Sequence, residues 1–190
     1  TSTEYCSVAL LRSAHADDAV STPQTWVRHE LTGAVSSTRV LPAIQELFAE
    51  SGLTLADCDA IAFGSGPGSF TGLRTACSVA QGLALGASLP VLPIDTLWSM
   101  AEDARHPLEA ARVMVLLDAR MGQIYAAAWA FDGGRWHNPQ TAALLNPTDL
   151  SWPSDWQSPG PSLRVAMLGL TQVPEVLQRQ APAGFDHVTA

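Results

Sequence analysis

One glycine-rich segment, residues 59–75, restricts the folds open to this chain more than any other feature. Ala60–Phe63 is a short apolar run of the kind that forms a buried strand, and glycines at positions 64, 66, 68 and 72 end it abruptly. Beyond the loop, apolar residues recur at three- and four-residue spacing from Leu73 to Ala84, which predicts an amphipathic helix that Gly86 ends in a left-handed cap. The sequence therefore predicts a strand, a glycine loop and a helix in succession.

Such a junction directs backbone N–H groups toward one point, which suits an anion. Its spacing fits neither the dinucleotide-binding Gly-x-Gly-x-x-Gly motif, nor a Walker loop, nor the Gly-x-Ser-x-Gly nucleophile elbow. The alternative is that the glycines serve only a tight turn that passes close to a neighbour. Ser69 or Thr71 is placed to cap the helix. The candidate contacts to an anion or nucleotide are Gly64, Gly66, Gly68, Ser69, Thr71, Gly72 and Arg74.

The helix after the loop is unusually rich in small residues at positions 76, 78, 80, 82, 84 and 86. Gly82 in a helix interior costs roughly 1 kcal/mol relative to alanine. Close approach of a second helix would explain that cost. The second helix could belong to this fold or to another protein.

The loop and its helix also carry a family resemblance. Gly66-Pro-Gly-Ser-Phe-Thr-Gly-Leu-Arg74, followed by Ala80-Gln-Gly-Leu-Ala84, resembles the signature of the bacterial TsaB (YeaZ) family. Three further stretches agree: Thr1-Ser-Thr-Glu4 with Cys6-Ser-Val-Ala-Leu10, Arg39-Val-Leu-Pro42, and Asp118-Ala-Arg-Met-Gly-Gln-Ile-Tyr125. The resemblance covers most of residues 1–131 and is vague after about Gly133.

The resemblance implies an α/β protein with the two-lobed ribonuclease-H-like fold that TsaD, actin, sugar kinases and heat-shock chaperones share. We expect an N-terminal lobe over residues 1–104, holding the glycine loop and the interface helices, and a C-terminal lobe over 105–190. Family members carry a short apolar strand before the Thr-Ser-Thr that opens this sequence, and further residues after its end. We therefore expect these 190 residues to be part of a longer chain.

The function implied by the resemblance is that of a noncatalytic partner of TsaD. TsaD would place threonylcarbamoyl on the adenosine next to the anticodon of tRNAs that read codons beginning with A, and ATP and metal would sit on TsaD. We expect a heterodimer with TsaD, TsaE in a larger complex, a homodimer when the chain is alone, and tRNA contact only through the complex. The expected interface residues are Val40, Ile44, Leu47, Ala76, Val79, Ala80 and Leu83.

Charge and cysteine usage support these expectations. Ten Lys and Arg against 18 Asp and Glu give a net charge of −8, which argues against this chain alone gripping a nucleic-acid backbone. The three cysteines are widely spaced among apolar residues and read as buried thiols in a reducing compartment. No signal segment or membrane-spanning run is evident, so we expect a cytoplasmic protein.

Elsewhere the pattern predicts a hairpin of strands 5–11 and 25–31, and a helix capped by Ser36, Ser37 or Thr38 and ended by Gly52. Pro42 predicts a kink or a late start in that helix. A second helix, capped by Asp95 or Thr96, runs to residue 104, and buried strand 112–117 ends in Asp118. The segment 151–161, with two tryptophans and three prolines, is expected to be a surface loop or a partner contact.

Two rival functions remain open at this stage. The glycine loop could serve an autonomous kinase-like enzyme that binds a nucleotide. A metallopeptidase is the weaker rival, because the five histidines form no zinc-binding spacing and no Ser-His-Asp set is evident. Asp118 lacks a second acid or histidine at a useful spacing, so we expect it to order its own turn with Arg120, and we predict neither catalytic nor metal-binding residues.

Overall fold

The computed structural model describes residues 5–13, 22–105, 112–156, 163–170, 172, 174–180 and 186–189. The chain divides into two compact units, Thr1–Ile94 and Asp95–Ala190. The helix at 96–105 belongs to the second unit, so the predicted boundary after residue 104 is wrong. The physical reason is that Leu97, Ala101 and Ala104 are buried against the second unit's sheet.

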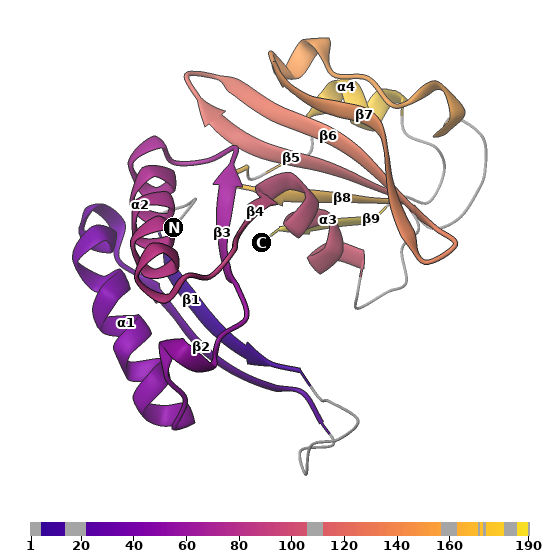
Figure 1. Ribbon diagram of the computed structural model, residues 1–190. Coiled ribbons are helices and arrows are strands. Elements are labelled where there is room, and N and C mark those ends of the chain that lie inside the picture. Colours follow the sequence, from indigo (N-terminus) through magenta and orange to yellow (C-terminus); the bar gives the residue numbers. More distant parts are fainter. Residues whose placement is uncertain are drawn as a thin grey trace. The chain divides into compact units, whose positions relative to one another are not determined.

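The first unit contains two separate pairs of strands and two long helices (Figure 1). Strands β1 (Tyr5–Arg12) and β2 (Gln24–Leu31) form the predicted antiparallel hairpin. Strand β3 (Ile61–Gly66) is hydrogen-bonded to β4 (Val91–Asp95). The short helices η1 (Gly33–Val35) and η2 (Leu55–Asp57) flank the first long helix.

Helix α1 (Ser36–Ser51) ends where expected, because Gly52 adopts the left-handed conformation and its N–H bonds to the Phe48 carbonyl. Its start differs from the prediction, since Val35 is the cap residue and the Thr38 hydroxyl donates back to the Val35 carbonyl. Pro42 lies inside the helix, six residues after its first residue, so the predicted late start is wrong.

Helix α2 (Phe70–Ala87) follows the glycine loop. It runs past Gly86, and Ser88 takes the left-handed cap with φ 56°, so the predicted glycine cap is wrong. The Ser88 N–H reaches the carbonyls of the last helical turn.

The second unit is built on a five-stranded sheet with the order β7-β6-β5-β8-β9 (Figure 1). Its strands are β5 (Arg112–Arg120), β6 (Gln123–Asp132), β7 (Arg135–Leu145), β8 (Leu163–Leu168) and β9 (Asp186–Thr189). The predicted buried strand at 112–117 is β5, and turns at Gly122 and at Gly133-Gly134 join β5, β6 and β7.

Alternate side chains of this sheet enter two different cores, as the two-residue period of a strand requires. On one face Val113, Val115 and Leu117 pack against helix α3 (Thr96–Arg105). On the other face Met114 and Leu116 pack against a layer that contains helices η3 (Pro147–Asp149), η4 (Ser154–Trp156) and α4 (Glu175–Gln180).

The segment 151–161 was expected to be a surface loop or a partner contact, and its first half instead belongs to this second core. Trp152 is 4% exposed and Trp156 1% exposed, and the Trp152 indole N–H donates to the Leu177 carbonyl over 3.2 Å. The two rings therefore form part of the fold's interior. Residues 157–161 of the predicted segment lie outside the described residues.

Candidate functional site

The glycine loop forms a tight turn between β3 and α2. Gly66 has φ +107°, and a Cβ at that position would lie 3.1 Å from Leu73 Cδ1, in the first turn of the helix. A side chain at this position would be strained by the backbone conformation, and the Leu73 side chain of α2 would have to shift by a few tenths of an ångström to admit its Cβ. The alternative of a tight turn that passes close to a neighbour is therefore realised at Gly66, whereas a Cβ at Gly64 would meet nothing within 4 Å.

The candidate anion contacts are spread around this turn. Ser69 is the residue that precedes the helix, but its side chain makes no capping hydrogen bond. Thr71 lies within α2, where its carbonyl accepts from the Thr75 hydroxyl, and Gly72 is buried. The Arg74 guanidinium lies 3.7 Å from the centroid of the exposed Phe70 ring, in a cation–π contact. An anion contact at this loop stays a prediction.

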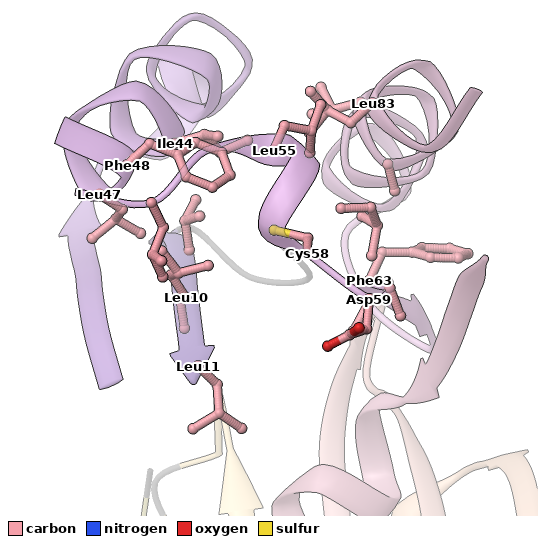
Figure 2. A pocket seen from close by; sticks show the side chains of 18 of the residues that line it. Leu10, Leu11, Ile44, Leu47, Phe48, Leu55, Cys58, Asp59, Phe63 and Leu83 are labelled. Carbon is pink, nitrogen blue, oxygen red and sulfur yellow. The ribbon is translucent and has the colours of Figure 1, made fainter. Parts of the chain in front are cut away.

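All seven predicted interface residues come together, but they line a groove within the first unit. The groove has a volume of about 720 Å³ and lies between β1 and β3, with α1 and α2 forming its other walls (Figure 2). Val40, Leu47 and Ala80 are nearly or fully buried. These three side chains therefore serve packing inside the unit, which contradicts their expected role on an exposed partner surface.

The opposite face of α2 is exposed and combines small with large apolar residues. Phe70 is 68% and Leu85 85% exposed. Gly82 is exposed, and a Cβ there would meet nothing within 4 Å, so no described part of the chain approaches it. The absence of a side chain at Gly82 thus does not serve the approach of a second helix within the described residues. We call the exposed residues at helical spacing, Phe70, Arg74, Ser78, Gly82 and Leu85, the outer stripe of α2.

An ionic network fixes α1 on the hairpin. Arg39 of α1 bonds to both Glu30 carboxylate oxygens at 2.7 Å and to Glu46 at 2.6 and 2.8 Å. Arg28 of β2 donates to Glu46 at 3.2 Å and to Glu50 at 2.6 Å. The hydrogen bonds from Arg39 and then Arg28, with their charges, lower the pKa of Glu46 to about 2. Bonding to Arg39 also lowers the pKa of Glu30.

Asp118 orders the turn at the end of β5, as the sequence predicts. Its Oδ1 accepts from the Arg120 N–H over 2.8 Å, and its Oδ2 lies 3.3 Å from Arg120 Nη1. Gly169, with φ +74°, sits against it, since a Cβ there would lie 2.9 Å from Asp118 Cβ. Sequence reasoning missed this contact, because only the parallel pairing of β5 with β8 brings the two residues together.

Within the described residues, no cluster of three or more His, Cys, Asp or Glu side chains is arranged to hold a metal ion. Cys6, Cys58 and Cys77 are free thiols. Burial is the main cause that raises the pKa of the Cys6 and Cys58 thiols. In the part of the chain that the structure covers, no helix has the length and apolarity needed to cross a membrane.

Comparison with known proteins gives one family. A family model described as "TsaD: tRNA N6-adenosine threonylcarbamoyltransferase" matches residues 14–162. The Escherichia coli "tRNA threonylcarbamoyladenosine biosynthesis protein TsaB" is 43% identical over 148 residues, which are 77% of this chain and 60% of that protein. Its Haemophilus influenzae namesake is 47% identical over 125 residues, 66% of this chain and 49% of that protein. The chain thus spans about half to three-fifths of the length of these curated relatives.

Solved structures give the same answer for the fold. YeaZ from Pseudomonas aeruginosa is 30% identical, with a TM-score of 0.76 over 98% of this chain and 81% of that one. A second structure, an uncharacterized Pseudomonas aeruginosa protein "with similarity to peptidase YEAZ", is 32% identical with a TM-score of 0.79 and the same coverage. The predicted α/β, ribonuclease-H-like fold class is confirmed.

Proposed function

Because the chain belongs to the TsaD family and, within it, to the TsaB (YeaZ) proteins, we propose that it is a noncatalytic partner of TsaD. The process is the threonylcarbamoylation of the adenosine beside the anticodon in tRNAs that read codons beginning with A. TsaD holds the ATP and the metal and performs the transfer, and this chain stabilises it. The net charge of −8 supports contact with tRNA only through the complex.

The observation that carries the proposal is the outer stripe of α2. It presents Phe70 and Leu85 to solvent at either end of the helix, with Gly82 leaving open space near Leu85. Because glycine carries no side chain, the backbone of a partner helix can approach there more closely than the usual 8–10 Å between helix axes. Burying the two large side chains would contribute about 1.5–3 kcal/mol each.

The same stripe serves the other expected assemblies. Leu41 of α1, which is 49% exposed, adds apolar surface on the neighbouring helix. We propose that a second copy of this chain occupies the stripe when TsaD is absent, in a self-complementary contact across a two-fold axis. TsaE joins the heterodimer in a larger complex.

Depletion of the protein tests the function directly. The modified adenosine in bulk tRNA, measured by mass spectrometry, should fall and should recover when the intact reading frame is restored. The control is an unrelated modified nucleoside in the same tRNA digest, which should not change. Full levels of the threonylcarbamoylated base in depleted cells would refute the proposal.

The substitution Gly82→Trp tests the surface. An indole at an open, exposed position leaves the monomer folded but keeps a partner helix from approaching, so co-elution with TsaD on size exclusion should be lost. Thr141→Trp, an equally bulky change at an exposed position of β7, is the matched control and should co-elute normally. Co-elution of both variants with TsaD would show that the interface does not lie on this face of α2.

The rival nucleotide-binding function rests on the glycine turn before α2. Calorimetry of the isolated chain with ATP and magnesium distinguishes the two functions, because a partner subunit that leaves ATP to TsaD should show no tight binding. Tight binding by the isolated chain would favour the kinase-like enzyme.

A further inference from the structure

Met121 lies at the tip of the hairpin that joins β5 to β6. Arg120 is paired with Gln123, so the loop between them consists of Met121 and Gly122 alone. Both residues have positive φ, 55° and 77°, as the type I′ turn of a two-residue hairpin requires. Met121 is 98% exposed, so none of the described elements covers its side chain.

The fold gives no reason for a methionine at this position. Asn, Asp and Gly are preferred in such turns, because they tolerate the left-handed backbone. A methionine there adopts a conformation that is unfavourable for an L-residue, and burial does not compensate, because nearly all of its surface faces solvent. What methionine supplies at position 121, and Asn, Asp or Gly would not, is an accessible sulfur atom.

The other three methionines are shielded. Met114 of β5 and Met167 of β8 are 0% exposed, inside the core on one face of the second unit's sheet. Met100 of α3 is partly buried against the core on the other face. A dissolved oxidant therefore reaches the thioether of Met121 directly, whereas it reaches Met114 and Met167 only when the unit opens.

We infer that Met121 is a site of reversible oxidation by hydrogen peroxide. The thioether sulfur attacks one oxygen of the peroxide, the O–O bond breaks, and a sulfoxide and a water molecule are formed. The sulfur loses two electrons and the peroxide gains them. Methionine sulfoxide reductases reverse the change, because two enzyme thiols become a disulfide and the sulfoxide oxygen leaves as water. This inference goes beyond the proposed function and does not depend on it.

The exposure of Met121 also determines what the modification does to the protein. A sulfoxide replaces an apolar side chain by a polar one. At Met114 or Met167 this would place a polar group among packed apolar side chains, which costs stability. At Met121 the new polar group lies in solvent, and the hydrogen bond from the Arg120 N–H to Asp118, which holds the turn, is untouched. The hairpin tip thus changes polarity while the fold stays intact.

Peroxide treatment of the intact protein, followed by peptide mass spectrometry, tests the site. Met121 should gain an oxygen at least about 10-fold faster than Met100 and about 100-fold faster than Met114 and Met167. The urea midpoint of protein oxidised at Met121 should equal that of untreated protein. Met121→Leu keeps an apolar side chain of similar size and is the matched control, which should show only the slow reactions. Oxidation of Met121 no faster than that of Met100, or a lowered urea midpoint, would overturn the inference.

The reverse step is tested with the reductases. Methionine sulfoxide reductases A and B each act on one of the two sulfoxide epimers. Peroxide attacks an exposed sulfur from either side, so reductase A with dithiothreitol should remove about half of the added oxygen, and both enzymes together should remove all of it. In peroxide-treated cells, the sulfoxide at Met121 should accumulate only when both reductases are deleted. Folded protein that resists both enzymes, or deleted cells without the sulfoxide, would refute the assignment.

Discussion

The substitution Gly169→Ala should strongly destabilise the second unit. A methyl group at Gly169 would lie 2.9 Å from Asp118 Cβ, a separation that packed carbon atoms do not adopt, on a backbone with φ +74°. The left-handed backbone costs an L-residue about 1–2 kcal/mol. Forcing an extra carbon into a close-packed site costs about 1–3 kcal/mol more. We expect the free energy of unfolding to fall by about 2–5 kcal/mol.

Gly134→Ala separates the two costs. Gly134 has φ +77°, almost the same backbone, but a Cβ there meets nothing within 4 Å. Urea unfolding followed by tryptophan fluorescence suits both variants, because every tryptophan except Trp26 lies in the second unit. The free energy of unfolding of the Gly134→Ala variant should fall only by the cost of the left-handed backbone, about 1–2 kcal/mol. In an Asp118→Gly background, Gly169→Ala should become milder by about 1–3 kcal/mol, because the clashing Cβ is gone. Equal losses for the Gly169 and Gly134 variants would refute the close-contact argument.

Three further changes test the rest of the structure. Because the pKa of Glu46 is lowered, the Arg39 network stabilises the fold above about pH 4.5 and loses that contribution as the pH falls toward 2. Arg39→Gln should therefore make the stability of the protein depend less on pH in that window, as measured by acid unfolding followed by circular dichroism. Arg179→Gln on α4, which removes an exposed ion pair with Glu175, should leave the pH dependence unchanged. Pro42→Ala should raise the free energy of unfolding by about 1–2 kcal/mol, because proline inside a helix removes a hydrogen bond and position 42 is exposed; an unchanged urea midpoint would contradict this. Thr96→Val should stabilise by about 1 kcal/mol in the same assay, because the buried Thr96 hydroxyl has no hydrogen-bond partner among the described residues; a loss of stability would reveal a missed partner.

The parts of the fold that follow from short-range signals could be predicted from the sequence. Alternation of apolar residues gave the β1–β2 hairpin, and Gly52 marked the end of α1, because a left-handed cap needs glycine and nothing distant. Asp118 was expected to hold its own turn, and the bond to the Arg120 N–H spans only two residues. In each case the decisive contact lies within a few positions of the residue concerned, or within one hairpin.

Apart from the ends of α1 and α2, the errors concern contacts between distant segments. Trp152 and Trp156 follow a run of polar and proline residues, which gives no local sign of burial. Their burial depends on α4, some twenty residues further along the chain, where the Leu177 carbonyl accepts a hydrogen bond from the Trp152 indole N–H. The boundary between the units was misplaced for the same reason, since Leu97 packs on strands that follow it. No local pattern shows which unit's sheet a helix such as α3 covers.

The predicted interface illustrates how an amphipathic helix should be interpreted. The apolar face of α2, including Val79 and Leu83, was assigned to a partner, but such a face first buries itself against its own unit, and here it lines the groove beside β3. What remains for a partner is the opposite face, where Gly82 and Leu85 are exposed. A glycine in a helix interior destabilises the isolated protein. No contact within the described residues explains the glycine at position 82. The surface most informative about function is therefore the one whose residues the monomer does not need.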